Sequence, residues 1–226
     1  MYIMPADIPA TNILGGCIAE YKNIWSKEKI NNYIDSIEKV SSDESLGINF
    51  VPAGLIGNMN NTIRTNSHLG LSVYANENEV MREINNDFHL TLNSGVSWYM
   101  KQFISGDPIY FSEPFNVLKY KGGEKYDAHY DGSTGTARSV SAILYLNDNY
   151  EGGELEFVNF NIKIKPVAGT LYLFPSNYAY SHIAHPVQSG TKYAIVTWMH
   201  DRILGQDGRN PFLQDTEHQG HNHSHE

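Results

Sequence analysis

The C-terminal half of the chain alternates between short apolar runs and turn-forming residues, and this pattern limits the possible folds most strongly. After Pro114, runs rich in Tyr, Val, Ile and Phe are separated by Gly, Asn, Asp and Pro as far as Met199, which is typical of antiparallel strands joined by turns. Strands of this length and spacing predict a barrel or jelly roll. The runs are Asn116–Tyr120, Tyr126–Tyr130, Ser139–Leu146, Gly153–Phe157, Asn161–Lys165, Thr170–Phe174, Ser181–Val187 and Tyr193–His200.

Two segments of the N-terminal half have the apolar spacing of amphipathic helices. The first begins after Ser26, a residue suited to cap a helix, and continues to Val40; the second runs from Glu79 to Phe103. The opening stretch as far as Cys17 contains prolines and a Gly15-Gly16 pair, which predict an extended arm and a turn. The helices are expected to support the strands.

These elements predict an α+β fold in a single domain. The chain has 226 residues, enough for one sizeable core but not for two comfortable ones. We expect the domain to cover 1–205, with supporting helices at about 20–104 and the barrel at about 115–202. The polar, histidine-rich segment 206–226 is expected to be a disordered tail, because chain ends are usually mobile and a flexible imidazole cluster binds many metals without function.

Composition narrows the partners. With a net charge of -9, the chain lacks the clustered positive charge that nucleic-acid binding requires, and its binding to anionic membranes is disfavoured. No apolar run approaches the roughly 20 residues of a membrane span, and no signal peptide is recognisable, so a soluble cytoplasmic protein is expected. Cys17 is the one cysteine; it excludes an intrachain disulfide and leaves His, Asp and Glu as metal ligands.

His129 and Asp131, in the β-like run Tyr126–Asp131, are candidate metal ligands. Residues two apart on a strand point to the same face, so both side chains can bind one ion. His182, on another predicted strand, would complete a set of two imidazoles and one carboxylate, which leaves positions open on Fe(II) for a co-substrate and O₂. The pair alone is a weak signal, since His and Asp can also be solvent-facing polar groups. His185 is either a surface residue or an alternative ligand.

Five segments in a fixed order carry a more specific signal. They are Asn116–Asp131 (NVLKYKGGEKYDAHYD), Arg138–Leu146, Glu151–Glu154 (EGGE), Pro166–Pro175, and His182–Lys192 followed by Trp198-Met199-His200. In this order they resemble the catalytic core of the prolyl 4-hydroxylases, within the iron and 2-oxoglutarate oxygenase superfamily. Ile63–Asn66 also looks like the RTS-type loop of that family, so the resemblance covers about residues 60 to 202.

The resemblance implies a double-stranded β-helix, a jelly-roll core like that of the cupins, with Fe(II), 2-oxoglutarate, O₂ and ascorbate as cofactors or co-substrates. It selects His182 over His185 as the third ligand, because the family places this histidine four residues before a proline and ten before a lysine. Lys192 would receive the distal carboxylate of 2-oxoglutarate, with a hydrogen bond from Tyr120. The residues implied to line a peptide groove are Tyr126, Arg138, Trp198 and His200, with Arg64 a weaker candidate.

The expected activity is therefore hydroxylation of proline in peptides or proteins, with succinate and CO₂ released. Three alternatives stay open: the same chemistry on another side chain, a free amino acid or a small metabolite; a non-catalytic barrel that binds a partner; and a nucleic-acid demethylase, which the acidic balance disfavours. Substrate choice is expected to depend on loops 41–78 and 132–137, and the shortness of the second loop predicts a reduced lid. The single cysteine and the missing signal peptide favour a compact microbial or viral relative over a collagen-processing enzyme of the secretory pathway.

Overall fold

The computed structural model describes residues 9–53, 62–104, 109, 111–132 and 138–201. Most of the predicted loop 132–137, part of the loop 41–78 and the predicted tail 206–226 lie outside these residues. Within them, both predicted long helices are confirmed, as α1 (Lys27–Ser42) and α3 (Glu79–Phe103). Each begins with a capped turn, because Ser26 Oγ accepts a hydrogen bond from the Lys29 amide and Asn78 Oδ1 accepts one from the Met81 amide.

The described strands form a large antiparallel sheet of nine strands. Its order is β1 (Asn12–Gly15), β2 (Ile18–Tyr21), β12 (Thr170–Pro175), β8 (Arg138–Tyr145), β15 (Lys192–His200), β6 (Asn116–Tyr120), β4 (Ser67–Gly70) and β3 (Val51–Pro52), with β5 (Phe111–Ser112) paired to β15.

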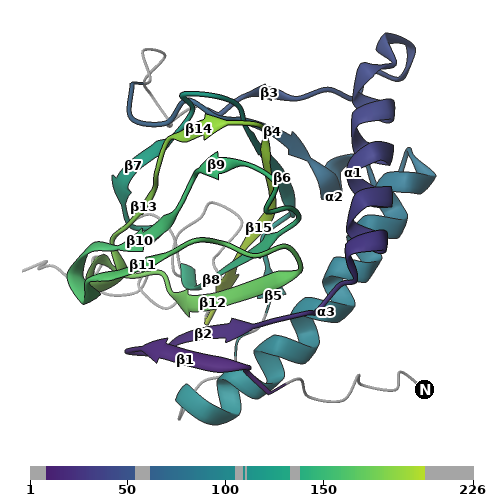
Figure 1. Ribbon diagram of the computed structural model, residues 1–226. Coiled ribbons are helices and arrows are strands. Elements are labelled where there is room, and N and C mark those ends of the chain that lie inside the picture. The colour runs from purple at the N-terminus through teal and green to yellow at the C-terminus, as the bar shows by residue number, and fades with distance from the viewer. Residues whose placement is uncertain (1–8, 54–61, 105–108, 110, 133–137, 202–226) are drawn as a thin grey trace, which may run out of the picture.

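A smaller antiparallel sheet of four strands faces the interior from the other side. Its order is β11 (Ile162–Ile164), β10 (Leu155–Phe157), β13 (His182–Ala184) and β7 (Tyr126–His129), and a separate ladder joins β14 (Val187–Ser189) to β9 (Glu151–Gly152). Figure 1 shows the strands of these sheets arranged around a common interior, with α1 and α3 outside it beside the large sheet. The short helical turns are η1 (Glu44–Leu46), α2 (Leu71–Tyr74), η2 (Val158–Phe160) and η3 (Tyr178–Tyr180).

The central strands β8 and β15 have one apolar face against the helices and one face toward the interior. Successive side chains of a strand point to opposite faces, so every second residue belongs to the same layer. The residues packed in the helix-facing core are Val140, Ala142, Leu144, Tyr193, Ile195 and Met199. The residues that line an interior cavity are Ser141, Ile143, Tyr145, Lys192, Ala194, Val196 and Trp198. This alternation places reactive side chains on a wall that the helices stabilise from behind.

The structure differs from the sequence prediction in two places. The segment Ser181–Val187, predicted as one strand, contains β13 and the beginning of β14, which pair with different strands. Pro186 lies at the break because it has no amide hydrogen to donate to a ladder. The opening stretch, predicted as an extended arm and a turn, forms the hairpin β1–β2 and extends the large sheet through β12.

That residues 1–205 form a single domain stays a prediction. Among the described helices, none combines the length and the apolar character that a membrane span requires.

Candidate active site

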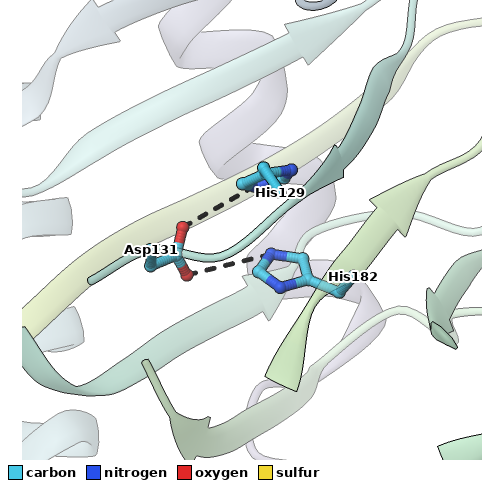
Figure 2. A group of neighbouring side chains, drawn as sticks. All are labelled: His129, Asp131 and His182. Carbon is cyan, nitrogen blue, oxygen red and sulfur yellow. Dashed lines mark ion pairs between the residues drawn. The ribbon is translucent and has the colours of Figure 1, made fainter. Parts of the chain in front are cut away.

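The three predicted metal ligands lie together on the lining of the interior cavity. His129 is the last residue of β7, Asp131 follows two residues later, and His182 begins β13, whose register sets it opposite His129. Figure 2 shows both imidazoles turned toward the carboxylate of Asp131. The distance from His129 Nε2 to Asp131 Oδ1 is 3.6 Å and that from His182 Nε2 to Asp131 Oδ2 is 3.8 Å. One nitrogen or oxygen from each residue lies within 4.8 Å of those of the others.

These distances fit a shared metal ion. Nitrogen and oxygen ligands lie about 2.0–2.2 Å from a divalent ion such as zinc, so two ligands of one ion are roughly 3 Å apart at a right angle and roughly 4 Å apart when opposite. The measured separations of 3.6 and 3.8 Å fall between these values. Two imidazoles and one carboxylate are also the donor set of non-haem Fe(II) sites with open positions.

Backbone carbonyl groups fix the tautomer of both histidines. The Nδ1 atom of His129 lies 2.8 Å from the carbonyl oxygen of Asp127, and Nδ1 of His182 lies 3.0 Å from that of Tyr180. A carbonyl oxygen only accepts hydrogen bonds, so each Nδ1 carries the hydrogen and each Nε2 keeps its lone pair. Outer hydrogen bonds of this kind orient metal-binding imidazoles in proteins.

The charge states at the site also favour a cation. Burial and the neighbouring His182 lower the pKa of His129 to about 3, so this imidazole is neutral at pH 7, as metal binding requires. Burial alone would raise the pKa of Asp131, but both histidines and hydrogen bonds from Ser141 and Trp198 hold it below its ordinary value. The group therefore presents the negative charge of Asp131 beside the neutral imidazole of His129.

The cavity extends from these ligands to Lys192, whose side chain is almost completely buried. Lys192 Nζ donates a hydrogen bond to the carbonyl oxygen of Gly153 at 3.1 Å and lies 4.3 Å from the ring centroid of Tyr120 and 6.0 Å from that of Tyr145. Among the described residues, no carboxylate forms an ion pair with this amine. Burial therefore lowers the pKa of Lys192 to about 7, although the charge of Glu154 opposes the shift. An anion entering this end of the cavity would find a buried partner.

Two of the four predicted peptide-groove residues line the same cavity. Tyr126 stacks on His129, with ring centroids 3.4 Å apart, and the guanidinium group of Arg64 lies 4.8 Å from the Tyr126 ring. Trp198 also lines the cavity, and the guanidinium group of Arg138 lies 3.8 Å from its ring. Tyr126 and Trp198 thus form an aromatic wall beside the metal ligands, and each of the two rings packs against an arginine guanidinium group.

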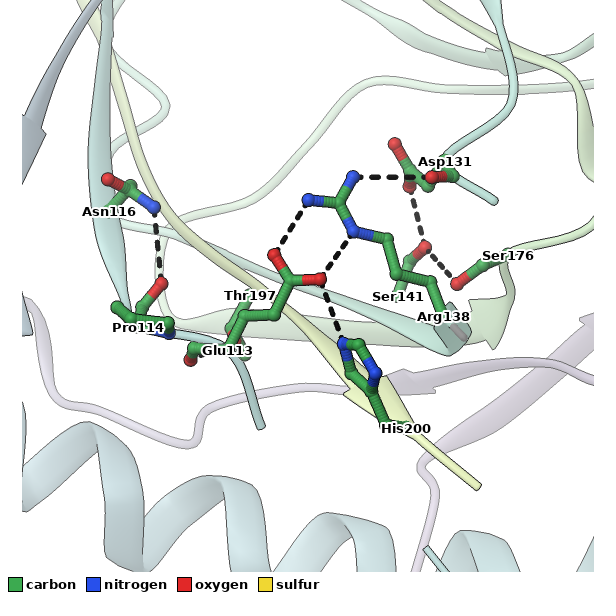
Figure 3. Close-up of polar contacts among 9 residues, drawn as sticks. All are labelled: Glu113, Pro114, Asn116, Asp131, Arg138, Ser141, Ser176, Thr197 and His200. Carbon is green, nitrogen blue, oxygen red and sulfur yellow. Dashed lines mark hydrogen bonds and ion pairs between the residues drawn. The ribbon is translucent and has the colours of Figure 1, made fainter. Parts of the chain in front are cut away.

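Arg138 and His200 do not line the cavity as the described residues define it. Both bind Glu113, which accepts two hydrogen bonds from Arg138 at 2.6 Å and lies 2.9 Å from His200 Nε2. Figure 3 shows this network beside Asp131, whose backbone carbonyl oxygen accepts a further bond from Arg138 at 3.2 Å. His185, the alternative ligand, pairs with Glu156 at 2.7 Å and lies outside the metal-ligand group.

Sequence reasoning missed three residues that the structure brings to this region. Ser141 and Tyr145 line the cavity from β8, and the two-residue period of that strand could have placed them on one face. Glu113 follows the two-residue strand β5, and no sequence pattern marked it as a partner of Arg138. The site thus depends on a segment that lies before the predicted barrel.

Comparison with known proteins agrees with the geometry. Residues 115–200 match the family model of the 2OG-Fe(II) oxygenase superfamily. The chain is 32% identical over 124 residues to probable prolyl 4-hydroxylase 9 of Arabidopsis thaliana, covering 42% of this chain and 43% of that protein. It is 24% identical over 223 residues to a putative prolyl 4-hydroxylase of Acanthamoeba polyphaga mimivirus, covering 82% and 88%. The chain thus spans less than half the length of the Arabidopsis relative.

Solved structures share the fold. A prolyl hydroxylase from Trichoplax adhaerens, in complex with a peptide fragment of the hypoxia inducible factor oxygen degradation domain, matches with a TM-score of 0.66 and 22% identity, over 81% of this chain and 83% of that chain. The viral collagen prolyl hydroxylase of Paramecium Bursaria Chlorella virus-1 matches with a TM-score of 0.55 and 26% identity, over 82% and 96%. These likenesses confirm the double-stranded β-helix predicted from the sequence.

The fold and the matched segment define a 2OG-Fe(II) oxygenase domain. Over residues 115–200 the chain matches that superfamily, and the relatives to which it is similar are named prolyl 4-hydroxylases, which agrees with the resemblance seen in the sequence.

Proposed function

We propose that this chain is an Fe(II)- and 2-oxoglutarate-dependent dioxygenase that hydroxylates proline residues in peptides or proteins. The observation that carries the proposal is one cavity lined both by His129, Asp131 and His182 and by the buried Lys192, which forms no ion pair with a carboxylate of the described residues. Such a cavity suits a small dicarboxylate that reaches a metal with one end and a cation with the other. The prolyl hydroxylases among the relatives support the substrate class.

In this proposal His129, Asp131 and His182 hold Fe(II) through the two Nε2 atoms and the carboxylate. When bound, the iron supplies the redox chemistry that couples decarboxylation of 2-oxoglutarate by O₂ to hydroxylation of a C–H bond, with succinate and CO₂ released. Ascorbate would serve as a reductant that keeps the iron in the ferrous state. The chain's own contribution is to hold the two imidazoles aligned with Nε2 toward the ion, as their carbonyl partners support.

The part of the cavity at Lys192 would bind the distal carboxylate of 2-oxoglutarate. A buried carboxylate without a partner costs several kcal/mol, and Lys192 can supply the compensating charge. Tyr120 and Tyr145 flank the amine, and their hydroxyl groups are suited to donate hydrogen bonds to the same carboxylate. Apolar side chains along the cavity, including Ile143, Leu155 and Val196, exclude water from the bound co-substrate.

The peptide substrate would enter beside the aromatic wall. Tyr126 and Trp198 would contact the residue to be hydroxylated, because both line the cavity next to the metal ligands. Arg138 and His200 would act on the substrate from the Glu113 network, where Arg138 also stacks on Trp198. The roles of these four residues follow from the family resemblance.

A succinate-release assay tests the proposal. Purified chain with Fe(II), 2-oxoglutarate and ascorbate is expected to produce succinate, and proline-containing peptides are expected to stimulate this turnover and gain the mass of one oxygen atom. His182→Ala should abolish turnover because it removes a metal ligand. His185→Ala is the matched control, since His185 lies three residues away and pairs with Glu156; this variant should keep full activity.

Three outcomes separate the alternatives. Succinate production with no peptide gaining mass would redirect the proposal to another side chain or a small molecule. Absence of succinate under all conditions would favour a non-catalytic binding module. Equal activity of wild type and His182→Ala would refute the assignment of the third ligand.

A further inference from the structure

Two buried serines form a hydrogen-bonded chain that ends on Asp131. Ser141 Oγ donates to Asp131 Oδ2 at 2.6 Å, and Ser141 Oγ lies 2.8 Å from Ser176 Oγ. The hydrogen bond between the two serines joins β8, which contains Ser141, to Ser176, the residue that follows β12 (Figure 3). Each serine is only 1% exposed, so water does not compete for these contacts.

The direction of these hydrogen bonds follows from the chemistry of the Asp131 carboxylate, which accepts the last of them. A carboxylate that binds a metal is ionised and can only accept hydrogen bonds. The Ser141 hydroxyl has one hydrogen, which it donates to Asp131, so its oxygen must accept the hydrogen of Ser176. All hydrogens therefore point toward the carboxylate, and both serines act on one of its two oxygens.

Backbone hydrogen bonds hold Asp131 and the two serines in place. The Gly132 amide donates to the carbonyl oxygen of Ser176 at 2.7 Å, and the Ser176 amide donates to the carbonyl oxygen of Ser139 at 3.0 Å. Arg138 binds the carbonyl oxygen of Asp131 itself. These hydrogen bonds fix the backbone around Asp131 and its two serine partners. The carboxylate of Asp131 therefore has little freedom to rotate.

We propose that Ser141 and Ser176 are positioning residues for the metal: the hydrogen bond that they direct to Oδ2 fixes the plane of the Asp131 carboxylate, so that the carboxylate meets the ion in one orientation. The inference rests on the proposed function, since it assigns the metal to this site. One fixed orientation of the carboxylate would keep coordination positions on the ion free for the co-substrate and O₂. A carboxylate released from Ser141 could rotate and bind through both oxygens, which would occupy a position that the reaction needs.

Mn(II) binding to the full chain, followed by the electron paramagnetic resonance of free Mn(II), tests the proposal without turnover. Ser141→Ala is expected to weaken binding by about 10- to 100-fold, as loss of an outer hydrogen bond does at other metal sites. Ser176→Ala should weaken it less, because Ser141 still donates to Asp131. Ser141→Thr should restore wild-type affinity, since it returns the hydroxyl group.

Two controls make the comparison specific. Ser94→Ala removes a buried hydroxyl that bonds to the Leu90 carbonyl oxygen at 3.1 Å in α3, so it reproduces the loss of a buried serine away from the metal ligands and should leave Mn(II) affinity unchanged. His182→Ala measures Mn(II) bound by other histidines, including those near the chain's end. If Ser141→Ala does not fold, Ser176→Ala and Ser141→Thr carry the test.

The visible absorption of the Co(II)-substituted chain provides a second readout. Its intensity depends on the coordination number, so Ser141→Ala should change the spectrum whereas Ser94→Ala should not. Binding of Mn(II) by Ser141→Ala within twofold of wild type, with an unchanged Co(II) spectrum, would overturn the inference alone. A wild-type chain that binds no more Mn(II) than His182→Ala would overturn the proposed function and the inference together.

Discussion

Lys192 is a buried amine whose charge depends on what shares its cavity. Burial lowers its pKa to about 7 from an ordinary value of 10.5, so the amine is largely neutral at pH 8 when no anion is bound. Burial raises the pKa of Tyr120 and Tyr145 beside it, so neither phenol titrates in this range. A bound carboxylate stabilises the ammonium form, and binding at pH 8 must therefore take up a proton.

We predict that 2-oxoglutarate binding to the Mn(II)-loaded chain weakens as pH rises above 7, by up to about tenfold per pH unit, the limit for uptake of one proton. Calorimetric titrations at pH 8 in buffers of different ionisation enthalpy measure the uptake directly, and it should approach one proton per ligand. Lys192→Arg should abolish it, because a guanidinium group stays charged. Equal uptake by wild type and Lys192→Arg would assign the proton to another group.

The lowered pKa of Lys192 also determines how the free energy of unfolding changes with pH. The unfolded chain, with a lysine pKa of about 10.4, binds more protons than the folded chain between pH 7 and 10. The contribution of Lys192 to the free energy of unfolding is therefore unfavourable below pH 7 and becomes less so as pH rises through this window. A bound dicarboxylate should reduce this pH dependence.

At the scale of elements, the approach of Gly132 to Ser176 links the end of β7 to the end of β12. A Cβ atom on Gly132 would lie 3.0 Å from the Ser176 carbonyl oxygen, a backbone atom that cannot rotate away. We predict that Gly132→Ala destabilises the chain by about 1–3 kcal/mol, the usual cost of overpacking, and lowers Mn(II) affinity. Urea unfolding and Mn(II) titration measure the two effects.

Gly122→Ala is the matched control for this variant. Its Cβ would come no closer than 3.9 Å to the Gln188 carbonyl oxygen, an ordinary contact, so stability and metal affinity should stay near those of wild type. Gly132→Ala with unchanged affinity would show that Asp131 tolerates a shift of this junction.

Elements with strong local signals were predictable, and elements that depend on distant partners were not. The period of the apolar residues, together with the cap at Ser26 for the first helix, predicted α1 and α3 almost to their bounds. Strand β1 is exposed or half-buried along its length and is held by pairing with β2, so local composition did not distinguish it from an arm.

The candidate site divides in the same way. The two-residue spacing of His129 and Asp131 predicted that both side chains face one ion, although Asp131 lies beyond the end of β7; the motif order supplied His182 and Lys192. Contacts between distant segments, such as that of Ser141 with Ser176, follow from the pairing of β8 and β12. That pairing is a property of the folded sheet and leaves no mark within either strand.

At the scale of the whole molecule, the metal ligands connect neighbouring strands of the small sheet, so metal binding should stabilise the fold. A ligand at 100 times its dissociation constant adds about 2.7 kcal/mol to the free energy of unfolding, which for a chain of this size raises Tm by roughly 5–10 °C. Thermal unfolding with and without Mn(II) tests this prediction. His182→Ala should lose the shift and His185→Ala should keep it; an equal shift in both variants would locate the bound metal elsewhere.

The alternation along β8 and β15 has a consequence for inherited variation. Val140, Ala142 and Leu144 pack against the helices, whereas Ser141, Ile143 and Tyr145 face the cavity. Neighbouring codons of one gene segment therefore fall under different selection, one set for the persistence of the folded chain and the other for the identity of its substrates. Exchange of a cavity-facing residue such as Ile143 could change what the cavity accommodates while the intervening residues preserve the wall behind it.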